Sequence, residues 1–206
     1  MARFNFEESE HYQQSGGNTT FFKLANDGQS AVCRFMFNTM DDLEGYALHE
    51  IQLDGKRRLV NCIRTYNDPI DNCPFCKANM SIVPKLFIPV YNCDAQQVQI
   101  WERGTAFFKK FIEPCAHNNP LVSGVFKVTR RGKPNDTKTD YDFYPIDKDN
   151  TTLEDLPEIP ELLGGLILDK TYEQMDEFLA TGSFGSGSSE HSSAKPEPKG
   201  RRGRNF

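Results

Sequence analysis

The amino-acid sequence predicts a mainly β protein with one packed domain and polar tails. Short apolar runs alternate with turn signals, such as Asn-Asp-Gly at residues 26–28 and Asp-Gly at 54–55, and this pattern is typical of antiparallel strands. Within the first 150 residues, one segment at 105–113 has the spacing of a helix face. Hydrophobic residues make up 37% of the 206 residues, so part of the chain is expected to lie outside the core.

The predicted elements follow one another along the chain. Strands are expected at residues 21–24, 31–38, 46–53, 56–63, 82–91, 97–101, 124–130 and 139–146. The Asn-Asp-Gly turn predicts that the first two strands form a hairpin. Pro84 and Pro89 place the strand at 82–91 at a sheet edge, because proline has no backbone N–H to donate. We expect Thr105 to cap the helix at its start and Pro114 to stop it.

Several short antiparallel strands with one helix indicate a small β-barrel or a β-sandwich, and periodicity alone does not choose between them. A five-stranded barrel of the OB-fold type fits the strand count, with a zinc-binding module inserted at about residues 46–80. We therefore expect the core at residues 20–147. The flanking segments are a flexible arm at 1–19, an acidic segment at 148–180 and a disordered, low-complexity tail at 181–206. A short amphipathic helix in the acidic segment could equally pack onto the barrel or bind a partner.

One histidine and three cysteines have the spacing of a metal site. His49 is followed by Cys62 after twelve intervening residues, by Cys73 after ten more and by Cys76 after two. The Cys-Pro-Phe-Cys knuckle can present two thiolates to one ion, and a folded hairpin would bring the other two ligands to it. Three sulfurs and one imidazole make a closed tetrahedral set, which predicts one structural Zn²⁺ rather than a catalytic one.

The six cysteines also allow other interpretations. A redox role for Cys-x-x-Cys expects a βαβ setting, whereas the flanking pattern here is hairpin-like. A disulfide expects secretion, but the N-terminal segment has no apolar core for a signal peptide, so we expect a reducing cytosol. His49 has the most rivals as a ligand, because Cys93, Cys115 or His117 could reach the same ion. Cys33 lies in an apolar run and is expected to be a small buried side chain.

Charge is distributed unevenly along a chain whose formal net charge is −5. Residues 51–138 carry fourteen Lys and Arg against seven Asp and Glu, whereas residues 149–178 carry nine acids and one lysine. The last 26 residues are basic again, with five bases and two acids. A basic domain that carries its own acidic segment is compatible with a polyanionic partner.

Basic and aromatic residues are interleaved between residues 56 and 138, as in the Phe-Phe-Lys-Lys run at 107–110. Single-stranded nucleic acid needs this combination, because cations track the phosphates and exposed rings stack on unpaired bases at about 1–3 kcal/mol each. These rings could instead fill the core, with the lysines only solvating the surface. The expected DNA contacts are Arg57, Arg64, Tyr66, Phe75, Lys77, Lys85, Trp101, Arg103, Lys109, Arg130 and Arg131.

The chain resembles a known family, the single-stranded-DNA-binding proteins of T-even-type bacteriophages. The similarity lies in the set His49, Cys62, Cys73 and Cys76, in the segment KLFIPVYNCDAQQVQIWERGTAFFKKFIE and in GVFKVTRRGKPNDTKTDYDF, and it covers about residues 20–147. The resemblance implies an OB-fold core and a structural zinc held by the same four residues. It also implies that the basic and aromatic block forms the DNA cleft.

By this resemblance, the protein coats and protects single-stranded DNA, largely without sequence preference, during phage DNA replication, recombination and repair in the cytoplasm of the infected bacterium. The expected partners are single-stranded DNA, further copies of the protein along the strand, and phage replication and recombination proteins that bind residues 149–206. The chain differs from the family in its N-terminal arm, where Arg3 stands among three glutamates, and in its basic C-terminal end.

Two other classes of function compete with DNA binding. A zinc-ribbon adaptor that binds a protein in a replication or transcription complex would make the basic surface incidental. An enzyme is the weakest alternative, because the sequence contains no P-loop, no nucleophile motif and no pair of carboxylates beside a histidine. No apolar run approaches membrane-spanning length, so no membrane partner is expected.

Overall fold

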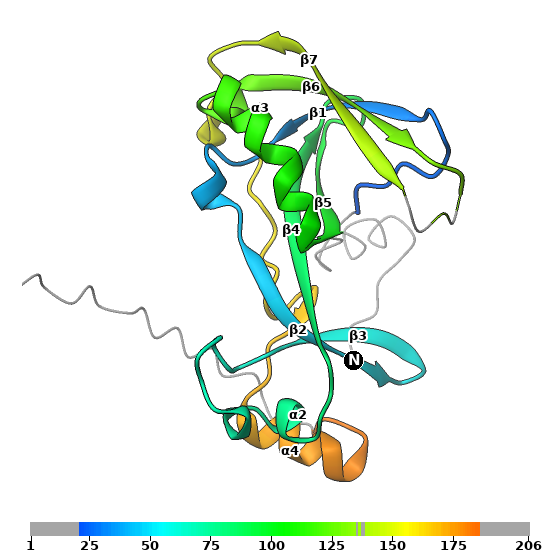
Figure 1. The fold of residues 1–206 in the computed structure, drawn as a ribbon, viewed down its shortest axis with the longest axis vertical. Helices are drawn as coiled ribbons and strands as arrows, with labels where there is room; N and C mark the ends of the chain where they lie inside the picture. The colour runs from blue at the N-terminus through cyan, green and yellow to red at the C-terminus, as the bar shows by residue number, and fades with distance from the viewer. Residues whose placement is uncertain (1–20, 135, 137–138, 186–206) are drawn as a thin grey trace, which may run out of the picture.

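A computed structural model describes residues 21–134, 136 and 139–185, and the fold is mainly β, as predicted (Figure 1). The strands are β1 (Ser30–Phe35), β2 (Gly45–Leu53), β3 (Lys56–Asn61), β4 (Ile82–Asn92), β5 (Gln97–Gly104), β6 (Gly124–Arg131), β7 (Asp140–Lys148) and β8 (Ile167–Leu168). The α-helices of the described residues are α2 (Pro74–Lys77), α3 (Ile112–His117) and α4 (Tyr172–Thr181). The 3-10 helices there are η1 (Met40–Asp42), η2 (Ile70–Asn72), η3 (Thr105–Phe111), η4 (Leu121–Ser123) and η5 (Leu153–Asp155). The predicted arm at residues 1–19 and residues 186–206 of the predicted tail lie outside the described residues.

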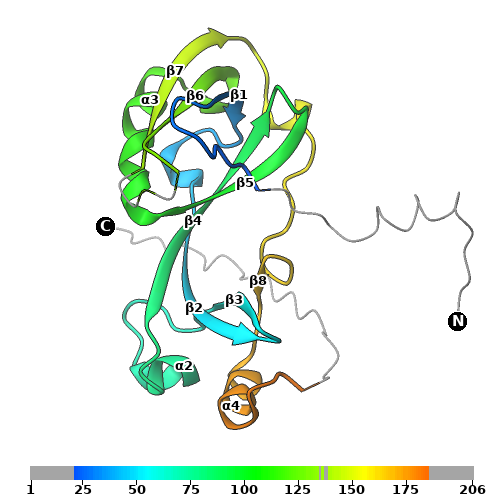
Figure 2. The ribbon, with the colours of Figure 1, turned by 90° about the vertical axis from the view of Figure 1, so that its right-hand side faces the viewer.

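The eight strands of the described residues belong to one mixed sheet, in the order β7–β6–β1–β4–β2–β3–β8, with β5 on the other edge of β4. The long strand β4 pairs with β2 near its start and with β1 near its end, while β5 runs along its other side. This arrangement gives two modules that share β4 (Figures 1 and 2). The upper module contains β1, β4, β5, β6, β7, η3 and α3, and the lower module contains β2, β3, β8, α2 and α4.

The upper module is not a closed barrel. Its strands lie in the order β5–β4–β1–β6–β7, and the outer strands β5 and β7 share no backbone ladder in the described part of the chain. Side chains bridge the gap instead: the rings of Trp101 in β5 and Tyr141 in β7 meet edge-to-face at 4.8 Å, and Arg103 donates a hydrogen bond to the Tyr141 hydroxyl. The mainly β character is therefore confirmed, whereas a closed five-stranded barrel is not.

The pairing of β4 corrects the prediction that residues 82–91 form an edge strand, because β4 has neighbours on both sides. Pro84 pairs with β2 but precedes the ladder to β5, which starts at Lys85. Pro89 pairs with β5 but lies in the gap between the ladders to β2 and β1. Each proline thus lies where one neighbouring ladder is interrupted, so its missing N–H costs no ladder hydrogen bond.

The segment at residues 21–24 also differs from its prediction, because it does not form a hairpin with β1. It lies beside β5, where Phe21 forms an isolated parallel bridge with Ile100 and a neighbouring N–H donates to the Ile100 carbonyl over 2.9 Å. The predicted turn does form, with Gly28 at a positive φ of 74° that glycine adopts without strain. The N–H of Gly28 donates to the carbonyl of Arg130 over 2.9 Å, so the turn leads β1 into its pairing with β6.

The predicted helix at 105–113 is present, but its limits differ. Gly104 rather than Thr105 precedes its first turn, and η3 continues directly into α3. Pro114 does not stop the helix, because it is the third residue of α3 and the first turn of an α-helix needs no N–H donor. None of the helices in the described residues is long and apolar enough to cross a membrane.

Aromatic side chains form the core of the upper module. Phe35 of β1 is fully buried, and its ring lies 4.7 Å from Phe111, 5.3 Å from Phe126 and 5.1 Å from Phe143. Such ring pairs contribute about 0.5–1.5 kcal/mol each beyond the burial of their area. A separate apolar cluster fills the lower module, and its buried members are Ile51, Val60, Cys73, Phe75, Cys76 and Met175.

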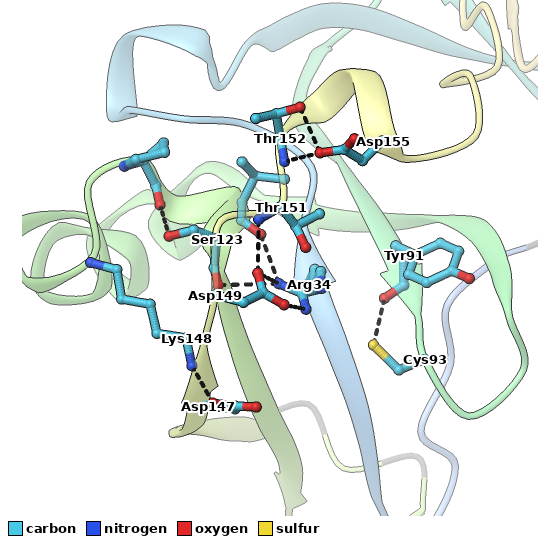
Figure 3. Close-up of polar contacts among 12 residues, drawn as sticks. Arg34, Tyr91, Cys93, Ser123, Asp147, Lys148, Asp149, Thr151, Thr152 and Asp155 are labelled. Carbon is cyan, nitrogen blue, oxygen red and sulfur yellow. Dashed lines mark hydrogen bonds and ion pairs between the residues drawn. The ribbon is translucent and has the colours of Figure 1, made fainter.

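The acidic segment descends along one side of the molecule from the upper to the lower module (Figure 2). We call residues 149–171 the strap. The strap begins at Asp149, whose carboxylate pairs with Arg34 of β1 over 2.5 Å (Figure 3), and hydrogen bonds from Arg34 and Thr151 lower the pKa of Asp149 to about 2. Farther along, β8 pairs with β3 in parallel, and α4 then packs in the lower-module cluster. The amphipathic helix therefore packs onto the lower module rather than onto the barrel strands.

Candidate metal centre and basic groove

Four side chains of the lower module converge, and they are the four predicted ligands. The ligand atoms of His49, Cys62, Cys73 and Cys76 all lie within 4.8 Å of one another. Nε2 of His49 lies 3.5 Å from the sulfurs of both Cys73 and Cys76, and the sulfurs of Cys62 and Cys76 are 3.6 Å apart. A tetrahedral zinc ion with bonds of about 2.3 Å to sulfur and about 2.0 Å to nitrogen has donor–donor edges of about 3.5–3.8 Å. The spacing therefore fits one tetrahedral ion.

Three kinds of local structure place these ligands. His49 lies within β2, where ladders to β3 and β4 fix its backbone on both sides. Cys62 directly follows β3, and its N–H donates to a carbonyl of β2 over 2.9 Å. Cys73 is the N-cap residue of α2, and Pro74 at the first helical position fits because its φ is already helical. One helical turn then returns Cys76 to the same side of α2 as Cys73.

The second ring nitrogen of His49 determines which nitrogen can bind a metal. Nδ1 lies 3.2 Å from the carbonyl oxygen of Ser81. A carbonyl oxygen only accepts hydrogen bonds, so Nδ1 carries the proton and Nε2, which faces the sulfurs, keeps its lone pair. Burial also lowers the pKa of His49, which favours the neutral, metal-binding imidazole.

Arg64 is the cation beside the thiols. A hydrogen bond to Cys76 and the charges of Cys76 and Cys62 raise the pKa of Arg64. One terminal nitrogen of its guanidinium donates to the carbonyl of Asp68 over 3.0 Å, whereas Nε is buried without a hydrogen-bond partner among the described residues. A divalent ion with three thiolates carries a net charge of −1, which a guanidinium at this position would balance. The structure thus places Arg64, a predicted DNA contact, beside two of the four candidate metal ligands.

The ligand set is enclosed by protein. His49 and Cys73 are fully buried and Cys76 is nearly so, while Cys62 is half-buried. Without a cation, burial raises the pKa of Cys62 to about 12, and a bound divalent ion would reverse this because a coordinating thiol is deprotonated. In the described part of the chain, no second group of three or more His, Cys, Asp or Glu ligands comes together. The three rival ligands considered from the sequence, Cys93, Cys115 and His117, are therefore not part of the centre.

A groove of about 530 Å³ opens in the upper module where β5 and β7 part. It brings together three of the predicted DNA contacts, Trp101, Arg103 and Arg130. Lys23 and Tyr141 also line it, together with residues of the segment at 21–26. The groove therefore combines three cations and the edges of aromatic side chains with one carboxylate, that of Glu102, which pairs with Lys85 over 2.9 Å.

Arg103 lies among the rings of this groove. Its guanidinium is 4.7 Å from the centre of the Trp101 ring and 4.5 Å from that of Tyr141. Burial lowers the pKa of Arg103, and its Nε has no hydrogen-bond partner among the described residues. A partly buried cation that lacks a salt bridge in this part of the chain is electrostatically under-compensated, so an anion in the groove would be stabilised.

Arg130 and the remaining predicted basic contacts have different roles. Arg130 holds backbone in place, since its guanidinium donates to the carbonyls of Leu24 and Lys133 over 2.9 and 3.0 Å. Three other predicted contacts have acidic partners: Arg57 with Glu50 at 2.6 Å, Lys85 with Glu102 at 2.9 Å and Arg131 with Asp142 at 2.6 Å. Tyr66, Lys77 and Lys109 are exposed, Tyr66 at 95%, but they lie outside the groove.

Two of the predicted stacking rings are buried. Phe75 is 0% exposed and Trp101 is 1% exposed. Phe75 lies in the lower-module cluster, and Trp101 packs edge-to-face against Phe22 and Phe107 at 5.0 Å each. The prediction that these two rings stack on bases is therefore wrong, because each has its faces covered by neighbouring side chains.

Sequence reasoning missed Lys23 and Tyr141 as groove residues. A signal for Lys23 existed, because the Phe-Phe-Lys run at 21–23 has the same basic and aromatic character as the block at 56–138. In the structure, Nζ of Lys23 lies 5.7 Å from the ring of Phe21, its neighbour in that run. Tyr141 gave no signal of its own, since only the approach of β7 to β5 brings it to the groove.

Fold and site together define a mainly β protein whose four-residue Cys/His cluster can hold one metal ion, with a donor set compatible with zinc. No protein-family model matches the chain, and no curated protein sequence matches it significantly. Its function is therefore argued from the metal centre and the groove.

Proposed function

We propose that this protein binds single-stranded DNA through the groove between β5 and β7 and coats it largely without sequence preference, as a non-catalytic protein. One observation carries the proposal: the groove holds a guanidinium that has aromatic neighbours but no salt bridge in the described part of the chain. Phosphates would supply the missing negative charge, and the partly exposed ring of Phe21 in the groove would contact an unpaired base. By the resemblance described above, the setting is phage DNA replication, recombination and repair, with replication proteins as partners of residues 149–206.

The strand order supports an OB-type origin for the upper module. An OB fold is a five-stranded, partly open Greek-key barrel that binds oligonucleotides on its second and third strands and in the loops between strands one and two and between four and five. In the order β5–β4–β1–β6–β7, β4 and β5 take the places of the second and third strands, and η3 with α3 lies between the third and fourth. The groove is lined by β5 and by Pro134 of the loop between β6 and β7, which is where such a fold would bind its ligand.

The proposed metal is one structural Zn²⁺. Three thiolates and one imidazole in a closed set are typical of structural zinc, and the tautomer of His49 suits it. The ion would fix the loop between β3 and α2, which carries the exposed ring of Tyr66. Elemental analysis of the purified chain should find one zinc per chain, and a content near zero after refolding with excess zinc would contradict this assignment.

Fluorescence anisotropy tests the DNA proposal. A labelled single-stranded oligonucleotide and its duplex are each titrated with protein at several salt concentrations. We expect tight binding to the single strand, weak binding to the duplex, and a logarithmic salt slope of about −0.7 for each phosphate contacted. Equal affinity for both oligonucleotides, or no binding to either, would refute the proposal.

A matched pair of variants then locates the site. Lys23→Ala removes an exposed cation from the groove and should reduce the salt slope by about 0.7, which corresponds to one phosphate contact. Lys127→Ala removes an exposed cation from β6 outside the groove and should leave the slope unchanged. Equal effects of the two substitutions would mean that the chain binds DNA through its general charge.

A zinc-stapled adaptor for a protein partner is the second candidate function. The loop between β3 and α2 exposes two large apolar side chains, Tyr66 at 95% and Ile70 at 59%, and such side chains are typical of protein contacts. Tyr66→Ala separates the two functions, because loss of a stacking ring costs about 1–3 kcal/mol of single-strand affinity. Unchanged DNA affinity would mean that Tyr66 does not stack on a base, and it would favour a protein partner for this loop.

A further inference from the structure

We propose that the metal centre and helix α4 form one interlocked unit, so that metal binding determines whether α4 stays docked on the lower module. The inference rests on the zinc site proposed above, but it needs no DNA binding. Its basis is a continuous set of contacts that leads from a metal ligand to the C-terminal end of the described chain.

A row of four aromatic rings makes this connection. The imidazole of His49 packs edge-to-face against Phe75 at 5.4 Å, and Phe75 packs in the same way against Phe178 of α4 at 5.8 Å. Phe178 in turn stacks on Phe184 at 4.7 Å. Phe75 stands between Cys73 and Cys76 in the sequence, so the two thiolate ligands on either side of it fix the ring against which α4 packs.

Neither helix at this contact is long enough to be stable alone. Helix α2 has four residues and α4 has ten, whereas isolated helices shorter than about 12–15 residues are marginal in water. Met175 of α4 is fully buried in the same cluster as Cys73 and Cys76. The apolar side of α4 is therefore held by side chains of the candidate metal-binding knuckle, which a bound ion would fix.

The strap before α4 has anchors that do not depend on the metal. Strand β8 pairs with β3 through Leu59 and Ile167 and through Val60 and Leu168, and the N–H of Lys170 donates to Asn61 over 2.8 Å. Loss of the ion should consequently release the chain from about residue 171 onward and leave β8 in place. This boundary distinguishes a specific interlock from general loosening of the lower module.

Coupling between two sites is reciprocal, so α4 must also retain the metal. If docking of α4 requires the ion, removal of α4 contacts weakens ion binding by the same factor. Energetic couplings of this kind typically amount to about 5–150-fold. We therefore expect loss of the Phe178 ring to increase the dissociation constant for zinc at least about fivefold.

The first experiment compares the full chain with and without metal. Zinc content is measured first, and hydrogen–deuterium exchange is then followed by mass spectrometry before and after chelation with EDTA. We expect peptides from residues 172–181 to lose protection on chelation, while peptides from β8, β6 and β7 keep theirs. The wild-type chain suffices for this measurement, so a variant that failed to fold would not prevent the test.

The second experiment uses two substitutions on α4. Phe178→Ala removes a ring that contacts Phe75, whereas Leu179→Ala removes a neighbouring side chain that is 41% exposed. A competition titration with a chromophoric chelator measures the zinc dissociation constant of each. We expect at least about a fivefold increase for Phe178→Ala and no change for Leu179→Ala.

The outcomes separate this inference from its premise. A zinc-containing chain whose α4 protection is the same with and without EDTA would overturn the interlock and leave the zinc site standing. Loss of protection throughout the upper module as well would also overturn it, because the ion would then support the whole fold. A chain that binds no zinc would refute the zinc site and the interlock together. The DNA-binding measurement is independent of these three outcomes.

Discussion

Replacement of Arg64 with methionine should weaken metal binding without unfolding the lower module. Interactions with Cys76 and Cys62 raise the pKa of Arg64, and its guanidinium also donates a hydrogen bond to the carbonyl of Asp68. It is the cation placed to balance the net charge of −1 on a divalent ion with three thiolates. Methionine keeps most of the apolar stem and removes only the charge and the hydrogen bonds.

The expected size of this effect follows from the position of Arg64. Removal of an outer-shell partner typically costs about 10–100-fold in metal affinity. The side chain of Arg64 is partly open to solvent, which screens its charge, so we expect a value near the lower limit, about tenfold. The effect should shrink further as salt is added, because screening acts on the charge and leaves the four ligands unchanged.

A zinc competition titration with a chromophoric chelator measures this change at low and high salt. Arg64→Lys retains a charge and should recover part of the affinity, and Arg58→Met, an exposed position on β3, is the control. An unchanged zinc affinity for Arg64→Met would refute the role of Arg64 in balancing the charge of the metal centre. If single-strand affinity and its salt slope fell at the same time, Arg64 would be a phosphate contact, as the sequence alone predicted.

Three further predictions concern the metal, the core and the strap. Cys76→Ser should lose bound zinc and melt at a lower temperature, and full zinc content by elemental analysis would contradict its role as a ligand. Phe35→Ala should lower the free energy of unfolding by about 3–5 kcal/mol in urea titrations, and a loss below about 1 kcal/mol would contradict the packing around this ring. Asp149 has a pKa of about 2 in the fold against an ordinary value of 3.8, so its stabilising pair with Arg34 is complete above about pH 4 and is lost as the pH falls to 2. The difference in melting temperature between wild type and Asp149→Asn should therefore disappear across that range, and a constant difference from pH 7 to pH 2 would count against the pair.

Local rules predicted the elements well where sequence neighbours decide the structure. The hairpin of β2 and β3 was predicted from Asp54-Gly55, and both residues have the positive φ, 51° and 72°, that such a turn needs. The four clustered Cys and His residues were predicted from a knuckle of four residues and one hairpin. In each case the residues that determine the structure lie within a short segment of the chain, at 54–55 for the turn and at 49–76 for the four ligands.

Contacts between distant segments were not predictable in the same way. Neighbouring residues of a strand point to opposite faces of the sheet. An aromatic residue next to a lysine or arginine in the sequence therefore need not lie at the surface with it. Trp101 and Arg103 share a face of β5, but Phe22, Phe107 and Tyr141 of three other segments pack against Trp101 and bury it. The amphipathic pattern of α4 likewise indicated an apolar face and gave no information on what covers it. Whether the barrel closes depends on the distance between β5 and β7, which no local pattern encodes.

Strand β4 belongs to both modules, and the chain passes between them three times, through β2, β4 and the strap (Figure 2). Neither module is therefore a continuous piece of sequence. A fragment that ended after residue 86 would keep all four metal ligands but lose β8 and α4, and one that began there would lose half of the central strand. Recombination between related sequences could not exchange the metal-binding half as a block.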